Sequence, residues 1–123
     1  MNPSNPQFMP AVYAFERKCD RFINDCKIAN LYASKHFFER AVERNLDVPN
    51  RFPQITRMIA EVWFAFKSHT YNEYSYKVMF KDIVMIAGVK VGMVSGRRML
   101  IVKSIWDSDA YDDDFSEVLR IAV

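Results

Sequence analysis

Three stretches in the first half of the chain carry apolar residues at intervals of three and four, the spacing of one face of a helix. The first covers residues 10–30, and the second covers 35–45 after Ser34, a residue type that caps helix N-termini. The third covers 53–66, where Pro53 is expected in the first turn. The pattern therefore predicts three amphipathic helices.

Beyond residue 70 the apolar pattern becomes alternating or continuous over short runs, as in strands. The predicted strands are 74–80, 82–88, 89–94 and 98–106. Gly88 is expected at a turn or bulge between the second and third, and Ser95-Gly96 at a compact hairpin. The last strand is the most apolar and is therefore predicted to be central. Residues 114–121 favour a short terminal helix.

Helices followed by strands, with no helix between the strands, predict an α+β fold rather than a doubly wound one. We expect the N-terminal helices to pack on a C-terminal four-stranded, mainly antiparallel sheet. The length of 123 residues suits a single domain spanning 1–123. Residues 1–8 lack the basic and apolar regions of a secretory signal and are predicted to be a flexible lead-in.

The charge is unevenly distributed, because residues 1–106 contain 16 Lys/Arg and 9 Asp/Glu whereas 107–123 contain one Arg and six acids. A basic body with an acidic tail suits an anionic partner. It also suits a tail that folds back over its own basic surface, or one that only aids solubility. The longest apolar runs fall well short of the roughly 20 residues needed to cross a bilayer. We therefore expect a cytoplasmic protein with no membrane contact.

The two cysteines, Cys19 and Cys26, are seven positions apart on one predicted helix face. That spacing corresponds to about 10 Å along a helix, which is too long for a disulfide. It also differs from the spacing of a zinc knuckle. We expect free thiols in a reducing compartment, and no metal site or cofactor.

The second predicted helix carries the most suggestive chemistry. His36, Arg40 and Arg44 fall within an arc of roughly 80° on its surface. Imidazole transfers protons near neutral pH, and guanidinium groups match phosphate oxygens. Metal-free RNA cleavage needs these groups, because a base, an acid and a cation must act around one phosphate. The alternative is a solvated helix face whose arginines pair with Glu39 and Glu43.

The segment His-Phe-Phe-Glu-Arg-Ala-Val-Glu-Arg-Asn-Leu at 36–46 resembles a helix of the RegB-like phage endoribonucleases. It is also similar to small RelE/ParE-like domains that carry a His-x-x-x-Arg-x-x-x-Arg helix before a sheet. The resemblance covers about 12 of 123 residues and implies metal-independent cleavage of messenger RNA. It assigns catalysis to His36, with Arg40 and Arg44 as the paired arginines. RegB-like enzymes use a second histidine on the next helix; here the only other histidine is His69, beyond that helix.

A second group of residues is predicted to hold RNA. His69 lies in a tyrosine-rich stretch whose aromatic rings would stack on bases, and cations on the strands would hold the backbone. The candidates for RNA contact are Lys35, Tyr71, Tyr74, Lys77, Arg97, Arg98 and Lys103. The alternative is a solvated loop, with strand tyrosines packed on the helices and a charged hairpin end.

The leading hypothesis is a RegB/RelE-like phage or mobile-element protein that acts in host takeover as a metal-independent mRNA endoribonuclease. Two alternatives compete with it. One is a non-catalytic phage protein of the same fold that binds and modulates a host protein. The other is a nucleic-acid binder without cleavage. The sequence does not fix the oligomeric state.

Overall fold

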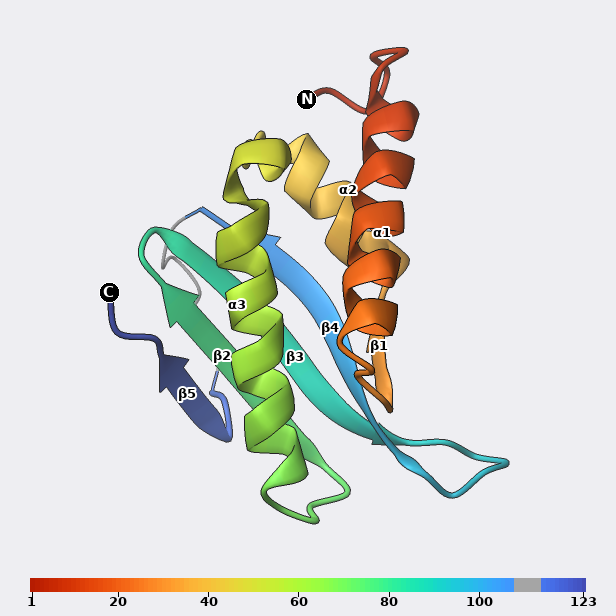
Figure 1. The fold of residues 1–123 in the computed structure, drawn as a ribbon, viewed down its shortest axis with the longest axis vertical. Coiled ribbons are helices and arrows are strands. Elements are labelled where there is room, and N and C mark those ends of the chain that lie inside the picture. Colours follow the sequence, from red (N-terminus) through yellow and green to blue (C-terminus); the bar gives the residue numbers. More distant parts are fainter. Residues whose placement is uncertain (108–113) are drawn as a thin grey trace.

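The computed structural model describes residues 1–107 and 114–123. Figure 1 shows three helices on one side of a single sheet, so the predicted α+β class is confirmed. The helices are α1 (Phe8–Asp25), α2 (Lys35–Glu43) and α3 (Val48–Lys67). The strands are β1 (Leu31–Ala33), β2 (Tyr74–Phe80), β3 (Ile83–Val91), β4 (Arg98–Trp106) and β5 (Glu117–Arg120).

The sheet is five-stranded and mixed, with the order β1-β4-β3-β2-β5, and not four-stranded and mainly antiparallel as predicted. Strands β2, β3 and β4 form an antiparallel meander. The two edge strands pair in parallel, β1 with β4 and β5 with β2. The central strand is therefore β3, which is buried over seven consecutive residues, and not β4.

Two of the predicted strands are one. Gly88 lies inside β3, where it pairs with Ser75 on one side and Ile101 on the other, so it makes no turn. The predicted turn at Ser95-Gly96 is confirmed, and Gly96 has the positive φ of 67° that favours glycine. The predicted terminal helix at 114–121 is wrong, because residues 117–120 form β5. Residues 108–113 of the predicted acidic tail lie outside the described part of the chain.

The helix boundaries differ from the predicted ones at two ends. Helix α1 ends at Asp25 because Lys27 takes a left-handed φ of 53°. Helix α3 begins at Val48, with Pro49 in its first turn, so Pro53 lies inside the helix instead of at its start. Helix α2 agrees with the prediction, and Ser34 caps it by accepting a hydrogen bond from the backbone N–H of Phe37.

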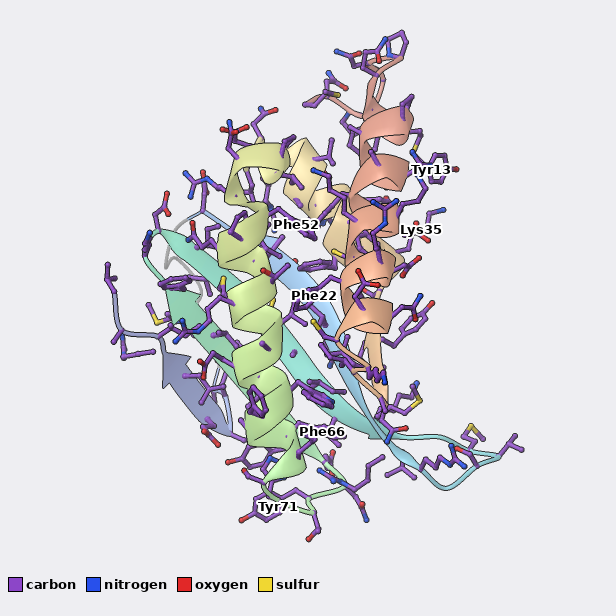
Figure 2. All side chains as sticks on the ribbon, viewed as in Figure 1. Tyr13, Phe22, Lys35, Phe52, Phe66 and Tyr71 are labelled. Carbon is purple, nitrogen blue, oxygen red and sulfur yellow. The ribbon has the colours of Figure 1, made fainter. Side chains whose placement is uncertain are left out.

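The core lies between the helices and the sheet. Phe15 is at its centre, with ring centroids 5.5 Å from Phe37 and 5.4 Å from Phe38. Figure 2 shows Phe22 and Phe52 between α1 and α3, and both rings pack against the core.

Both ends of the predicted lead-in are held by contacts. The amino group of Met1 donates hydrogen bonds of 2.9 Å to the carbonyl oxygens of Val42 and Glu43, and the backbone N–H of Phe8 donates to Asn5. The flexibility expected for residues 1–8 stays a prediction. None of the described helices combines the length and the apolar character needed to cross a bilayer.

The two cysteines are free. Cys19 is buried in the core, and burial raises the pKa of its thiol to about 12. Cys26 is exposed just after α1.

Candidate nucleic-acid interface

Strand β1 covers only part of the edge of β4. The pairing stops at Ala33 with Val102, so residues 103–106 of β4 have no strand neighbour on that side among the described residues. The hydroxyl of Ser34 donates to the carbonyl of Lys103 at 3.2 Å. Arg44 donates to the carbonyl of Ile105 at 2.7 Å. Two side chains at the two ends of α2 therefore occupy the place of the missing strand.

These two bonds fix the direction of the predicted row of His36, Arg40 and Arg44 on α2, which we call the stripe. From His36 to Arg44 is about 12 Å along the helix, and 103–106 of β4 span about 10 Å. The stripe therefore runs beside the uncovered edge of β4, from the level of Lys103 to that of Ile105.

The stripe residues have different surroundings. His36 is exposed and makes no hydrogen bond or ion pair with any other described residue. Arg40 forms an ion pair of 3.0 Å with Glu43. Arg44 stacks on the ring of Trp106, with its guanidinium carbon 4.6 Å from the centroid. Burial and the charge of Arg40 lower the pKa of Arg44. His36 is therefore accessible to a ligand, whereas Arg44 binds the edge of β4.

Lys35, at the start of the same helix, is also exposed. It lies 3.9 Å from Glu39, one turn along α2. Pairs of this kind on a solvated helix contribute little to stability.

His69 is not brought together with His36. Arg98 lies 3.4 Å from Nδ1 of His69 and is seven residues before Ile105 on β4, a separation of about 23 Å. Lys103, beside the start of α2, is five residues from Arg98, or about 16 Å. The two predicted catalytic histidines therefore lie at different places on the molecule.

The surroundings of His69 are those of a structural anchor. Its ring packs on Tyr71 and Tyr74, both at 4.7 Å between centroids. Its Nε2 is hydrogen-bonded to the hydroxyl of Tyr76, and its Nδ1 accepts from the backbone N–H of Tyr71 at 3.4 Å. Burial and the charge of Arg98 lower the pKa of His69. Because both ring nitrogens are engaged and the neutral form is favoured, His69 ties its loop to β2.

The same cluster holds three other predicted RNA contacts. Arg98 donates to the carbonyl of Tyr71 at 2.6 Å and stacks on Phe66 at 4.5 Å. Figure 2 shows Tyr71 at this end of the molecule, beyond Phe66. Tyr74 donates a hydrogen bond of 3.1 Å to Glu117. The pKa of Tyr74 is raised, mainly because of burial and secondly because of this hydrogen bond. Tyr71, 55% exposed, is the tyrosine here that keeps a large accessible surface.

Arg97 lies in the exposed turn between β3 and β4, next to this cluster. Its backbone carbonyl accepts from the N–H of Gly92 at 2.8 Å, which closes the turn. No side-chain bond ties its guanidinium to the rest of the described chain.

The second face of the sheet is not covered by any described helix or strand (Figure 1). We call it the open face. Side chains alternate along each strand, and those that pack in the core fix which positions point away from the helices. The open face is formed by Tyr32, Ser75, Lys77, Met79, Val84, Ile86, Gly88, Lys90, Met99, Ile101, Lys103, Ser104, Trp106, Val118 and Arg120.

The open face is basic. Its strand positions include Lys77, Lys90, Lys103 and Arg120, and none of those described is a carboxylate. Glu117 points to the helix side, where it accepts from Tyr74. Val84, Ile86 and Gly88 are buried although they belong to the open face, so its exposed described positions are Tyr32, Lys90, Lys103, Val118 and Arg120.

The sequence pattern identified Lys77 and Lys103 as candidates but missed Tyr32, Lys90 and Arg120. Lys90 and Lys103 both follow buried valines in alternating runs, which is a signal of strand positions facing away from a core. Tyr32 and Arg120 lie on three- and four-residue strands, too short for that signal.

Comparison with protein families, with curated proteins and with solved structures finds no match to this chain. In the part of the chain that the structure describes, no three His, Cys, Asp or Glu side chains gather closely enough to hold a metal ion.

Proposed function

We propose that this protein binds single-stranded RNA across the open face and along the edge of β4 next to α2. The observation that carries the proposal is the charge of the open face, which has four cations and no carboxylate among its described positions. Phosphates bind to such a surface by releasing their counterions. Tyr32, which is 59% exposed, adds aromatic surface on which a base stacks.

The resemblance of 36–46 to RegB-like and RelE/ParE-like proteins supports the same class of partner, messenger RNA. The stripe that carries the resemblance borders the open face, because Arg44 contacts both Ile105 and Trp106. One RNA strand lying on the sheet would reach Arg40 and His36 at its edge.

The test is fluorescence anisotropy with a labelled single-stranded RNA of 12 nucleotides and mixed sequence, at several salt concentrations. We expect the triple variant Lys90→Gln, Lys103→Gln, Arg120→Gln to bind weakly. Its slope of log K against log salt should fall by about 2, because each phosphate that is no longer neutralised lowers the slope by about 0.7.

The matched control removes three exposed cations from around α1, with Arg17→Gln, Arg21→Gln and Lys27→Gln. It changes the net charge equally and should keep most of the slope. Equal losses of affinity in the two triple variants would show that net charge, and not the open face, governs binding. No binding by the unmodified protein would contradict the proposal and favour the alternative of a host-protein partner.

Cleavage of the bound RNA is a second candidate function, favoured by His36, which is exposed, bonds to no other described residue and lies one turn from Arg40. His36 would take the proton from a 2′-hydroxyl, whose oxygen attacks the adjacent phosphorus. The bond to the 5′-oxygen breaks, and that oxygen takes a proton from water. The products are a 2′,3′-cyclic phosphate and a 5′-hydroxyl, with no cofactor or metal. Arg40 and Lys103 would stabilise the charge on the phosphate.

This candidate is tested with labelled messenger RNA in EDTA. We expect cyclic-phosphate ends from the unmodified protein, and a loss of about 100-fold or more in rate for His36→Gln with unchanged RNA affinity. His69→Gln is the control and should still cleave, because His69 lies at a different place. Intact RNA with the unmodified protein would refute cleavage and leave RNA binding alone.

A further inference from the structure

The row of side chains on the open face is interrupted at Gly88. The end of the Lys103 side chain lies over Gly88, and beside it is a hollow of about 480 Å³, lined by Tyr32, Gly88, Val89, Lys90, Ile101 and Lys103. We call it the Gly88 hollow. Its floor crosses three neighbouring strands, because Gly88 pairs with Ile101 and Ile101 pairs with Tyr32. Its volume lies in the range of small-molecule sites, about 300–1,000 Å³.

A β-bulge directs Lys103 over this hollow. Ile86 pairs with Ser104 and Ala87 with Val102, so Lys103 is the extra residue in β4. A Cβ atom on Gly88 would lie 2.9 Å from the amine of Lys103, which therefore extends directly across the glycine. Bulges near functional sites often change the direction of one side chain in this way.

The bulge is held from outside the sheet. The carbonyl of Lys103 accepts the hydroxyl of Ser34, and the carbonyl of Val102 accepts the backbone N–H of Ser34 at 2.9 Å. The start of α2 thus fixes the backbone that carries the amine.

Among the described residues, the lining combines one aromatic ring, two amines and no carboxylate. Tyr32 is 59% exposed although it lies within a strand, so much of its ring is available for stacking. Lys90 and Lys103 are exposed on two sides of Gly88. An aromatic face suits a planar base, and paired ammonium groups suit a phosphate.

We propose that the Gly88 hollow binds one nucleotide, with its base against Tyr32 and its phosphate between Lys90 and Lys103. This rests on the proposed function insofar as the nucleotide belongs to an RNA strand. The site itself is testable with a mononucleotide.

The first experiment follows backbone amide chemical shifts of the ¹⁵N-labelled protein during titration with AMP. We expect shifts centred on Gly88, Ile101 and Tyr32. Adenosine and ribose 5-phosphate, which each carry half of the recognised chemistry, should produce weaker shifts at the same amides. Shifts spread evenly over exposed lysines, without Gly88, would overturn the proposal.

Gly88→Val is the blocking variant. Gly88 has no positive φ, valine suits a strand, and the atoms nearest to the new Cβ belong to the flexible end of Lys103. The variant should keep its thermal midpoint and lose the AMP shifts. If Gly88→Val fails to fold, Tyr32→Ala gives the same test from the wall of the hollow.

The second experiment measures the 12-nucleotide RNA with Tyr32→Ala, and with Tyr13→Ala on α1 as the control. Both tyrosines are exposed, at 59% and 50%, and Figure 2 shows Tyr13 pointing away from α1. Loss of one stacked base should weaken RNA binding about tenfold in Tyr32→Ala and leave Tyr13→Ala unchanged.

The outcomes separate the two proposals. RNA bound equally by Tyr32→Ala, Gly88→Val and the unmodified protein overturns the nucleotide site but leaves RNA binding on the rest of the open face. AMP bound in the hollow without any RNA binding overturns the proposed function and retains a mononucleotide site.

Discussion

Arg44 takes the place of a strand partner where β1 ends. Its guanidinium donates to the carbonyl of Ile105 and stacks on Trp106. We expect Arg44→Ala to lower the free energy of unfolding by about 1–3 kcal/mol, because a half-buried carbonyl loses its donor and the aromatic ring loses a cation. Urea denaturation measures the change.

The control for that variant is Arg40→Ala, one turn earlier on α2. Its ion pair with Glu43 is largely solvated and should contribute less than about 1 kcal/mol. Equal losses of stability in the two variants would mean that Arg44 is only another surface charge.

His69 gives the stability a pH dependence. Its pKa in the folded protein is lowered by burial and by Arg98 from the ordinary value of 6.5, so below that value the unfolded chain binds the proton more readily. The contribution of neutral His69 to the free energy of unfolding is therefore present above about pH 6.5 and is lost as the pH falls below that value. We therefore expect the thermal midpoint to fall between pH 7.5 and pH 5.

The variant His69→Gln should flatten that profile, whereas His36→Gln should leave its slope unchanged. A profile that is the same in all three proteins would assign the pH dependence to carboxyl groups instead.

At the scale of residues, the sequence indicated which side chains are exposed, but not which residues they contact. The helical period placed His36 on a solvated face, and the structure agrees. It could not show that Arg44 reaches Ser104 and Ile105, because that contact joins positions about 60 apart in the chain. For the same reason the contact of His69 with Arg98, 29 positions further along the chain, could not be foreseen.

Ser34 connects two elements. Its hydroxyl accepts from the N–H of Phe37 at the start of α2 and donates to the carbonyl of Lys103 in the bulge of β4. Ser34→Ala should therefore lower the free energy of unfolding by about 1–2 kcal/mol in urea denaturation. Ser4→Ala removes a hydroxyl that bonds only to Asn2 and should cost less than about 0.5 kcal/mol.

Ser34→Ala should also weaken RNA binding if the bulge positions Lys103 for the Gly88 hollow. A loss of stability with full RNA affinity would confine Ser34 to a capping role.

At the scale of elements, long periodic segments were predicted well and short ones were not. The three helices and the strands at 74–80 and 98–106 follow from their patterns. Strands β1 and β5 have three and four residues, which is too few to show alternation, and each is paired from a distant part of the chain. Glycine is common in turns, which is why the pattern predicts one at Gly88, whereas here its missing side chain leaves room for the end of the Lys103 side chain.

The whole domain depends on one core. Phe15 contacts the rings of Phe37, Phe38 and Phe52 from the other two helices. Phe15→Ala should cost about 3–5 kcal/mol, a large part of the stability of a domain of this size. Scanning calorimetry should show one transition in the unmodified protein and a strongly lowered midpoint in the variant.

Phe64→Ala is the control, because that ring is 58% exposed and its loss leaves no cavity in the core. Two separate transitions in the unmodified protein would contradict a single cooperative unit. At this scale the sequence predicted the α+β class but not the face of the sheet that stays open, because burial of a strand position depends on which side its neighbours cover.

The two parallel edge strands set an order of assembly. The meander of β2, β3 and β4 joins neighbours through short turns, whereas β1 must find β4 across α2, α3 and half of the sheet. Pairing across a long stretch of chain is slow, because closing the loop costs entropy before the pairing can stabilise the chain. The meander is therefore expected to form first and the edges last. Lys103 belongs to the meander, which forms early, and Tyr32 to the edge strand β1, which pairs late. The two residues would therefore meet only in the final step of folding.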